Sequence, residues 1–322
     1  MNRSSLLRTS AALLAVALLA VPAFAKDDAL SLVPANAVTV GMVKLAELRT
    51  SPLSSMLFEH TDKMSTDGEA AKFLAETGLS PLKDIDVLVV ASAPRTNLGS
   101  EADVLVIAEG RFNPERLGAA LTSRGAVKKA NYFLVPEEQG DRPAVAFPSA
   151  SLVIAGTERA VVSALEARAS GGTGFMVRSG LGMDAARINA NASAWAVVDV
   201  VRAARLTKGG SINTGHGQSG DALRTAIKSL STVAVWATDT GDSLKLGAFG
   251  LSNDDETLEL LEDTVRGALS ALRLAVKDKS PDMVPVLRRF DVSRTKDSIV
   301  VEGSIPASTL RDMMAKKRAS MQ

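Results

Sequence analysis

The stretch from Ala102 to Leu121 constrains the fold of this chain more than any other. It begins with a β-branched apolar run, Val104 to Ile107, which is typical of a strand buried on both faces. The run ends at Gly110. Asn113 and Pro114 then indicate a helix start, because Asn accepts hydrogen bonds from free helix amides and Pro has no amide to satisfy. The stretch therefore predicts a strand that leads directly into a capped helix.

A second copy of this strand-to-helix unit lies between Leu244 and Leu261. Its strand ends at Gly250, and Asn253 is the expected cap of the helix that follows. Three acidic residues, 254–256, come next, and negative charge is favoured at the positive end of a helix. Two units of one design predict an internal duplication.

The other strand and helix signals repeat in the same order along the two halves. Corresponding positions are separated by 198 − 43 = 155, 253 − 113 = 140 and 303 − 156 = 147 residues. Short strands divided by Gly, Asp and Pro predict hairpins, and helices follow them. We therefore expect an α+β fold of two tandem repeats, 26–172 and 173–322, each a mostly antiparallel sheet with helices packed on one face. The Gly-rich segment 169–173 is the expected boundary.

The first 25 residues have the composition of a secretory signal peptide. Arg3 and Arg8 precede an apolar core, 11–21, which is too short to span a bilayer, and Ala-Phe-Ala at 23–25 is a small-x-small cleavage site. Cleavage is expected after Ala25. Because no cysteine follows the apolar core, a lipid anchor of the lipoprotein type is not expected. The mature chain of 322 − 25 = 297 residues is predicted to be periplasmic or secreted, with no transmembrane segment.

Charge and cysteine content exclude several classes of function. Without Arg3 and Arg8, 37 − 2 = 35 basic residues face 36 acidic ones, so no broad basic field exists to attract nucleic acid. The absence of cysteine excludes disulfides and thiolate metal sites. An exported chain without cysteine fits a bacterial periplasm better than a disulfide-rich extracellular scaffold.

Three motifs carry a resemblance. The entry segment Leu32 to Val40, the junction Gly110 to Leu117, and the strand followed by a helix from Ser151 to Leu165 resemble a loose group of bacterial exported proteins built from tandem α+β units. No catalytic residues are assigned in that group. The resemblance implies an architecture and transfers no site.

One glycine motif matches a nucleotide-binding pattern. Residues 215–220, Gly-His-Gly-Gln-Ser-Gly, fit G-x-G-x-x-G and precede a predicted helix. A phosphate cradle needs a strand directly before the glycines. The preceding segment, 207–214, is instead rich in Lys, Gly, Ser and Asn. A solvated linker is the favoured interpretation, and no cofactor is predicted.

The chain has two histidines, His60 and His216, which lie in different halves. A hydrolytic zinc site needs three ligands at helical or hairpin spacing, and neither histidine has such neighbours. His60 is better explained by a helix end, where positive charge is favoured. A hydrolase that uses His216 remains an alternative, but no G-x-S-x-G elbow is present. We predict no catalytic, cofactor-binding or metal residues.

Two charged clusters have simple explanations. Asp254, Asp255, Glu256, Glu259 and Glu262 could suggest a cation site, but they fall in the first turns of a helix and not in a Gly-containing calcium loop. They are expected to oppose the helix dipole. The basic end of the chain, Lys316-Lys317-Arg318, could attract anionic lipids only weakly.

The apolar strands provide the strongest indication of function. If helices cover one face of each sheet, the opposite faces of strands such as Val87 to Val90 and Val233 to Trp236 still need burial. Burial could come from the two repeats packing sheet against sheet or from a dimer, and repeat packing is the favoured solution. The alternative is a cleft for a lipid or an extended peptide. We therefore expect a non-catalytic binding or interaction protein of the cell envelope, or alternatively a periplasmic carrier of an apolar ligand.

Overall fold

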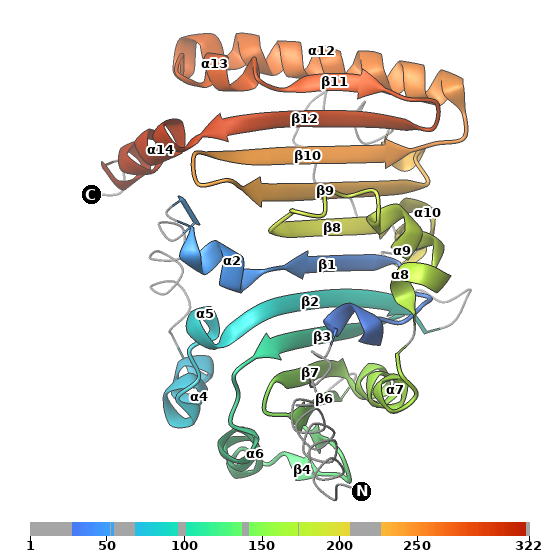
Figure 1. The fold of residues 1–322 in the computed structure, drawn as a ribbon, viewed down its shortest axis with the longest axis vertical. Helices are drawn as coiled ribbons and strands as arrows, with labels where there is room; N and C mark the ends of the chain where they lie inside the picture. The colour runs from blue at the N-terminus through green and yellow to red at the C-terminus, as the bar shows by residue number, and fades with distance from the viewer. Residues whose placement is uncertain are drawn as a thin grey trace, which may run out of the picture.

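The computed structural model describes residues 28–51, 53–54, 68–95, 101–136, 142–172, 174–206 and 227–319. In this part of the chain every strand belongs to one antiparallel sheet, in the order β11-β12-β10-β9-β8-β1-β2-β3-β7-β6-β5-β4 (Figure 1). The strands are β1 (Thr39–Val43), β2 (Ile85–Pro94), β3 (Ala102–Gly110), β4 (Val127–Lys128), β5 (Phe133–Leu134), β6 (Pro143–Ser149), β7 (Leu152–Thr157), β8 (Ala194–Asp199), β9 (Thr232–Asp239), β10 (Ser243–Leu251), β11 (Asp291–Arg294) and β12 (Ser298–Pro306).

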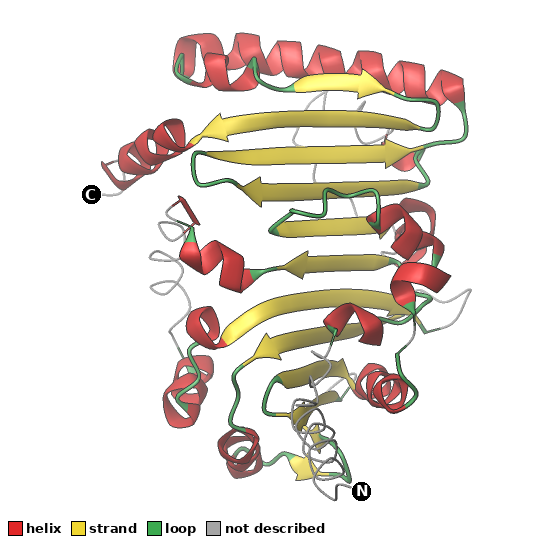
Figure 2. Cartoon of the chain, viewed as in Figure 1, coloured by secondary structure: helices red, strands yellow, loops and turns green. Residues whose placement is uncertain are grey.

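The helices lie mostly along the margins of the sheet and at the ends of its strands (Figure 2). They are η1 (Ala29–Leu32), α2 (Leu45–Thr50), α4 (Glu69–Thr77), α5 (Pro81–Asp84), α6 (Pro114–Ser123), α7 (Glu158–Ala169), α8 (Phe175–Arg178), α9 (Gly180–Ala185), α10 (Val200–Leu206), α12 (Asp255–Lys279), α13 (Met283–Leu287) and α14 (Ala307–Ala319). The predicted α+β class is confirmed.

The middle of the sheet is the pairing of β1 with β8. These strands lie antiparallel, with Thr39 opposite Val198 at one end and Val43 opposite Ala194 at the other. Backbone bonds extend the pairing beyond the strands, because the Lys44 amide donates to the Ser193 carbonyl at 2.8 Å. Two segments at least 194 − 43 = 151 residues apart in sequence thus share one hydrogen-bonded ladder. From this seam, β2-β3-β7 and β9-β10-β12 extend outward in the same chain order.

The predicted stacking of one sheet on the other is wrong. The two halves join edge to edge through β1 and β8, so their apolar faces do not cover one another. The physical reason is that an exposed strand edge presents a row of unpaired N–H and C=O groups, and pairing two edges satisfies both rows. The division into two repeats and the boundary near residue 172 stay predictions.

One face of the sheet, which we call the first face, carries the main core. The helices η1, α7, α8 and α9 supply buried residues to it, and Phe175 and Val161 are fully buried there. Facing them from the strands are side chains in one alternating set: Val40, Val89, Ala91, Leu105, Ile107, Leu152, Ile154, Val197, Ala234 and Phe249. A smaller core lies on the other face at the far end, where Leu258 and Leu261 of α12 pack near Val292 and Ile299.

The predicted strand-to-helix junction after β3 is confirmed. The Asn113 side chain accepts a hydrogen bond from the Arg116 amide at 3.0 Å, and Pro114 is the first residue of α6. Gly110 is required because a Cβ there would lie 1.9 Å from the Asp84 carbonyl oxygen. This close backbone approach lets the chain turn from β3 into α6.

The cap of α12 is one residue later than predicted. Asp254, and not Asn253, accepts from the Thr257 amide at 3.0 Å. The Thr257 hydroxyl also donates to this carboxylate, and these hydrogen bonds lower the pKa of Asp254. A charged acceptor at the positive helix end is favoured over a neutral amide, which explains the shift.

Replacement of Asn113 tests the cap of α6. Asn113→Ala removes the acceptor for the Arg116 amide, so the free energy of unfolding should fall by about 1 kcal/mol in urea denaturation. Asn113→Ser supplies another acceptor and should retain most of the stability. Equal stability of Asn113→Ala and the parent would contradict the role of the cap.

A carboxylate ties the two halves together beside the seam. Asp239, the last residue of β9, accepts a hydrogen bond from the Ser54 hydroxyl and another from the Gly241 amide at 2.8 Å. Burial raises the pKa of Asp239, but the hydrogen bonds from Ser51, Ser54 and Gly241 outweigh burial and leave this pKa below its usual value. The ionised form is therefore the one that the fold stabilises.

Acidification should remove this contribution. Because the folded-state pKa of Asp239 is lowered, its stabilisation is present above the ordinary value of about 3.9 and is lost as pH falls through the lowered value. Asp239→Asn should lower the melting temperature at pH 7, and the difference from the parent should shrink toward pH 2.5. Ser54→Ala should behave likewise and be non-additive with Asp239→Asn. A difference that grew at low pH would contradict the assignment.

Candidate functional site: the second face of the sheet

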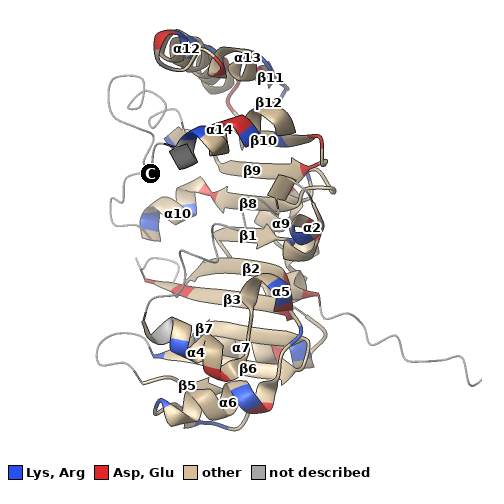
Figure 3. Cartoon of the chain, turned by 90° about the vertical axis from the view of Figure 1, so that its left-hand side faces the viewer, with Lys and Arg blue, Asp and Glu red and all other residues tan. Residues whose placement is uncertain are grey.

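The second face is the side of the central strands opposite the main core. Its side chains fall into three rows that cross β3, β2, β1, β8, β9 and β10. The registers of those strands define the rows: Ala108-Leu88-Val43-Ala194-Ala237-Leu246, then Val106-Val90-Gly41-Ala196-Val235-Ala248, then Val104-Ser92-Thr39-Val198-Val233-Gly250. Apart from Ser92 and Thr39, every member is apolar or glycine. The edge-on view in Figure 3 likewise shows strands that are almost entirely free of charged residues.

Several of these apolar side chains are open to solvent. Val90 is 42% exposed, Val104 is 44% exposed and Val235 is 49% exposed. Val90 and Val235 lie in the same row, on the strands that flank the seam. Single exposed apolar residues are ordinary, but a contiguous apolar face is not. The second face therefore has the character of a binding surface.

In the middle row of the second face, the side chains at the seam are smaller than those beside them. Gly41 and Ala196 lie opposite each other on β1 and β8, and Val90 and Val235 follow on the outer strands. Since adjacent strands are spaced by about 4.8 Å, the two valines define ridges roughly 14 Å apart. We call the surface between them, formed by Gly41 and Ala196, the seam strip. A Cβ at Gly41 would meet the Trp195 carbonyl oxygen only at 3.6 Å, so packing does not require this glycine.

The face offers almost no hydrogen-bonding capacity. Its central strands are paired on both sides, so their backbone groups are used within the ladder. Among the side chains, only Ser92 and Thr39 carry hydroxyl groups. The three rows hold no charged side chain and no histidine. What the face can do chemically is cover apolar surface.

The glycine motif 215–220, with His216, and also His60 lie outside the described residues. The acidic cluster on α12 is largely used in ion pairs, because Arg294 lies 3.1 Å from Asp255, 3.8 Å from Glu259 and 3.4 Å from Glu262. Within the described ranges, no group of three or more His, Asp or Glu side chains is placed to hold a metal ion.

At the basic C-terminal end, Lys316 pairs with Asp282. This contact raises the pKa of Lys316 and lowers that of Asp282. The side chains of Lys317 and Arg318 lie outside the described residues. Across the parts of the chain that the structure describes, no helix has both the length and the apolar character needed to cross a bilayer.

Comparison with known proteins gives distant structural matches. No protein-family model matches the chain, and no curated protein sequence matches it. A crystal structure of TP0453, crystal form IV, is similar with a TM-score of 0.48 and 12% identity, covering 89% of this chain and 96% of that one. Crystal form III gives a TM-score of 0.47 and 11% identity, with coverage of 90% and 98%. These values are too low to carry an argument about function.

Proposed function

We propose that the protein is an exported, non-catalytic binding protein of the bacterial cell envelope, and that the second face holds a hydrocarbon chain of its ligand. The observation that carries this proposal is the exposure of Val90, Val104 and Val235 on a face without charge. Covering each of these half-exposed valines would contribute on the order of 1 kcal/mol. The proposed location rests on the signal-peptide composition of residues 1–25.

The lack of hydrogen-bonding groups favours a hydrocarbon over an extended peptide. A peptide laid on this face would lose its backbone hydrogen bonds to water, and only Ser92 and Thr39 could replace them. It could not add as a strand either, because the central strands already have neighbours on both sides. A hydrocarbon chain has no such groups to satisfy. The seam strip would receive it between the ridges of Val90 and Val235.

Export and ligand can be tested in one preparation. The full chain, expressed with its own leader in a bacterium, should be recovered from the periplasmic fraction with Lys26 as its first residue. Native mass spectrometry of that material should show an added mass that organic extraction identifies as a lipid or fatty acid. Recovery of the uncleaved chain in the cytoplasm would contradict the location. A bound protein, or no added mass, would contradict the ligand class.

Filling the seam strip should block binding without harming the fold. Gly41→Val places a β-branched side chain where a Cβ has only ordinary contacts, so the melting temperature should be unchanged or higher. Affinity for a fluorescent C16 fatty acid should fall about tenfold or more, since each 1.4 kcal/mol of lost contact is tenfold. Val177→Leu on α8, at a site that is 80% exposed, is the control and should bind like the parent. Unchanged binding by Gly41→Val would remove the strip from the site.

A polarity change on the ridges provides a separate test. Val90→Thr with Val235→Thr preserves shape and strand propensity but places two hydroxyl groups against the chain. Burying hydroxyl groups without partners costs roughly 1–3 kcal/mol each. Fatty-acid affinity should therefore fall at least about tenfold in fluorescence titration. Retained affinity in this variant, with an intact circular dichroism spectrum, would contradict binding at the second face.

A further inference from the structure

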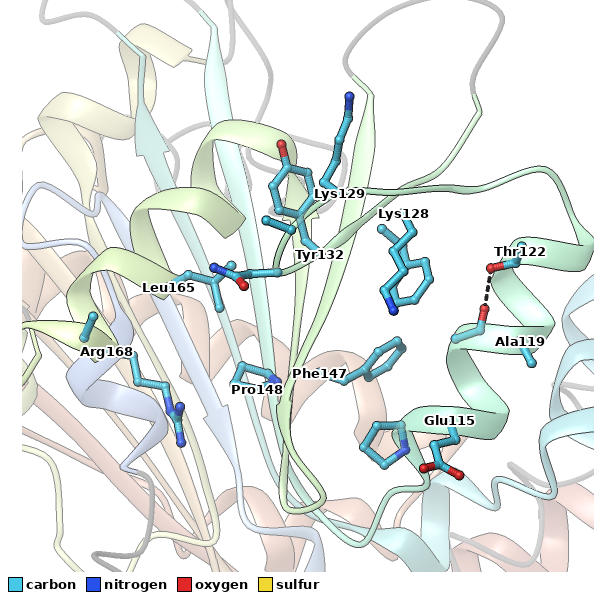
Figure 4. A pocket seen from close by; sticks show the side chains of 16 residues that line it. Glu115, Ala119, Thr122, Lys128, Lys129, Tyr132, Phe147, Pro148, Leu165 and Arg168 are labelled. Atoms are coloured by element: carbon cyan, nitrogen blue, oxygen red, sulfur yellow. Dashed lines mark hydrogen bonds between the residues drawn. The ribbon is translucent and has the colours of Figure 1, made fainter.

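A cavity of about 850 Å³ lies at the β4 end of the sheet, between α6 and α7. Figure 4 shows Arg168 and Leu165 extending from α7 on one side and Glu115 and Ala119 from α6 on the other, with Phe147 and Pro148 between them. We call it the aromatic pocket. Its volume falls within the range of about 300–1,000 Å³ that small-molecule sites occupy.

Aromatic side chains are concentrated here. Three of the sixteen lining residues are aromatic, Tyr132, Phe133 and Phe147, although aromatic residues make up 4% of the chain. At that frequency fewer than one would be expected. The rings of Phe133 and Phe147 are 5.9 Å apart and tilted by 58°. All three residues are only partly buried, so their rings remain available to a ligand.

The backbone of α6 is adapted to this aromatic wall. Gly118 faces Phe133, and a Cβ at this position would lie 2.9 Å from the ring. The glycine therefore lets the ring approach the helix closely. On the other side, the Tyr132 hydroxyl donates to the Glu158 carboxylate at 2.6 Å. This bond holds the tyrosine in place at the pocket wall.

The charge around the pocket is positive. Lys128, Lys129 and Arg168 line it, and Glu115 is the single acidic residue in its wall. The Lys128 ammonium lies 6.0 Å from the centre of the Phe133 ring, while the Lys129 amide donates to the Tyr132 carbonyl at 2.8 Å and fixes the turn. Neither lysine pairs with a carboxylate within the described ranges. Figure 4 shows Lys129 extending away from Lys128, beside Tyr132, and Arg168 also suits the negative end of α7, so Lys128 carries the charge argument.

We propose that the aromatic pocket binds a small organic anion, in which a carboxylate or phosphate group meets Lys128 and an apolar body lies against Phe133 and Phe147. This site is distinct from the second face and does not depend on the proposed function. The aromatic rings supply apolar contact area, and the Lys128 ammonium supplies charge-assisted hydrogen bonds. A neutral molecule of the same shape would lack the second contribution.

The only tyrosine of the chain makes the site directly observable. Protein with 3-fluorotyrosine in place of tyrosine gives one ¹⁹F resonance, from Tyr132. Hexyl phosphate and hexanoate, added separately, should each shift that resonance saturably, and 1-hexanol should do so at least about tenfold more weakly. The phosphate and carboxylate arms distinguish which head group is preferred. No saturable shift with either anion up to 10 mM would overturn the proposal.

Matched lysine variants separate specific binding from general charge. Lys128→Gln with Lys129→Gln should weaken anion binding about tenfold or more. Lys245→Gln with Lys296→Gln removes two exposed lysines outside the pocket and should leave binding unchanged. Val90→Thr with Val235→Thr should also leave it unchanged, so that failure of the proposed function and failure of this site give different results. Equal affinity in the two lysine variants would overturn the proposal.

Discussion

The pairing of β1 with β8 is the interaction on which the rest of the structure depends. Five residue pairs, from Thr39 opposite Val198 to Val43 opposite Ala194, join the two halves of the chain into one ladder. Without that pairing each half would end in an unpaired strand edge, which is costly to bury and prone to association. The Lys44 and Asp239 contacts beside the seam reinforce the join with hydrogen bonds between residues far apart in sequence.

Joining edges instead of stacking faces has a direct consequence for function. The strands are apolar on both sides, yet the helices η1, α7, α8 and α9 contribute to the core on the first face only. At the far end, α12 covers part of the second face. Between them, Val90 and Val235 remain exposed beside the small residues Gly41 and Ala196. Surface of this kind is stabilised by an apolar partner, which is why binding is the function that the architecture supports.

Local features of the fold could be predicted from sequence, and long-range ones could not. The Asn113 cap, Pro114 and, to within one residue, the start of α12 follow from capping chemistry, which acts over a few residues. The short helix α9 is capped, because the Ser179 side chain accepts from the Gly182 amide, but it also includes Gly180 at its start. The helices α8 and α13 have no side-chain cap. Stacking and edge pairing both bury apolar strands, and the sequence pattern is the same for each. The row from Val106 to Ala248 depends on strand register, which is a long-range feature. The aromatic pocket likewise unites segments that are up to 169 − 114 = 55 residues apart in sequence.

The central claim is that the joined sheet holds a hydrocarbon chain on its second face, across the seam. Photo-crosslinking with a diazirine-bearing C16 fatty acid, followed by peptide mass spectrometry, tests it most directly. Adducts are expected on β1, β2, β8 and β9, at residues whose side chains belong to the three rows of the second face. Adducts confined to the helices of the first face, or none on these four strands at saturating fatty acid, would contradict it.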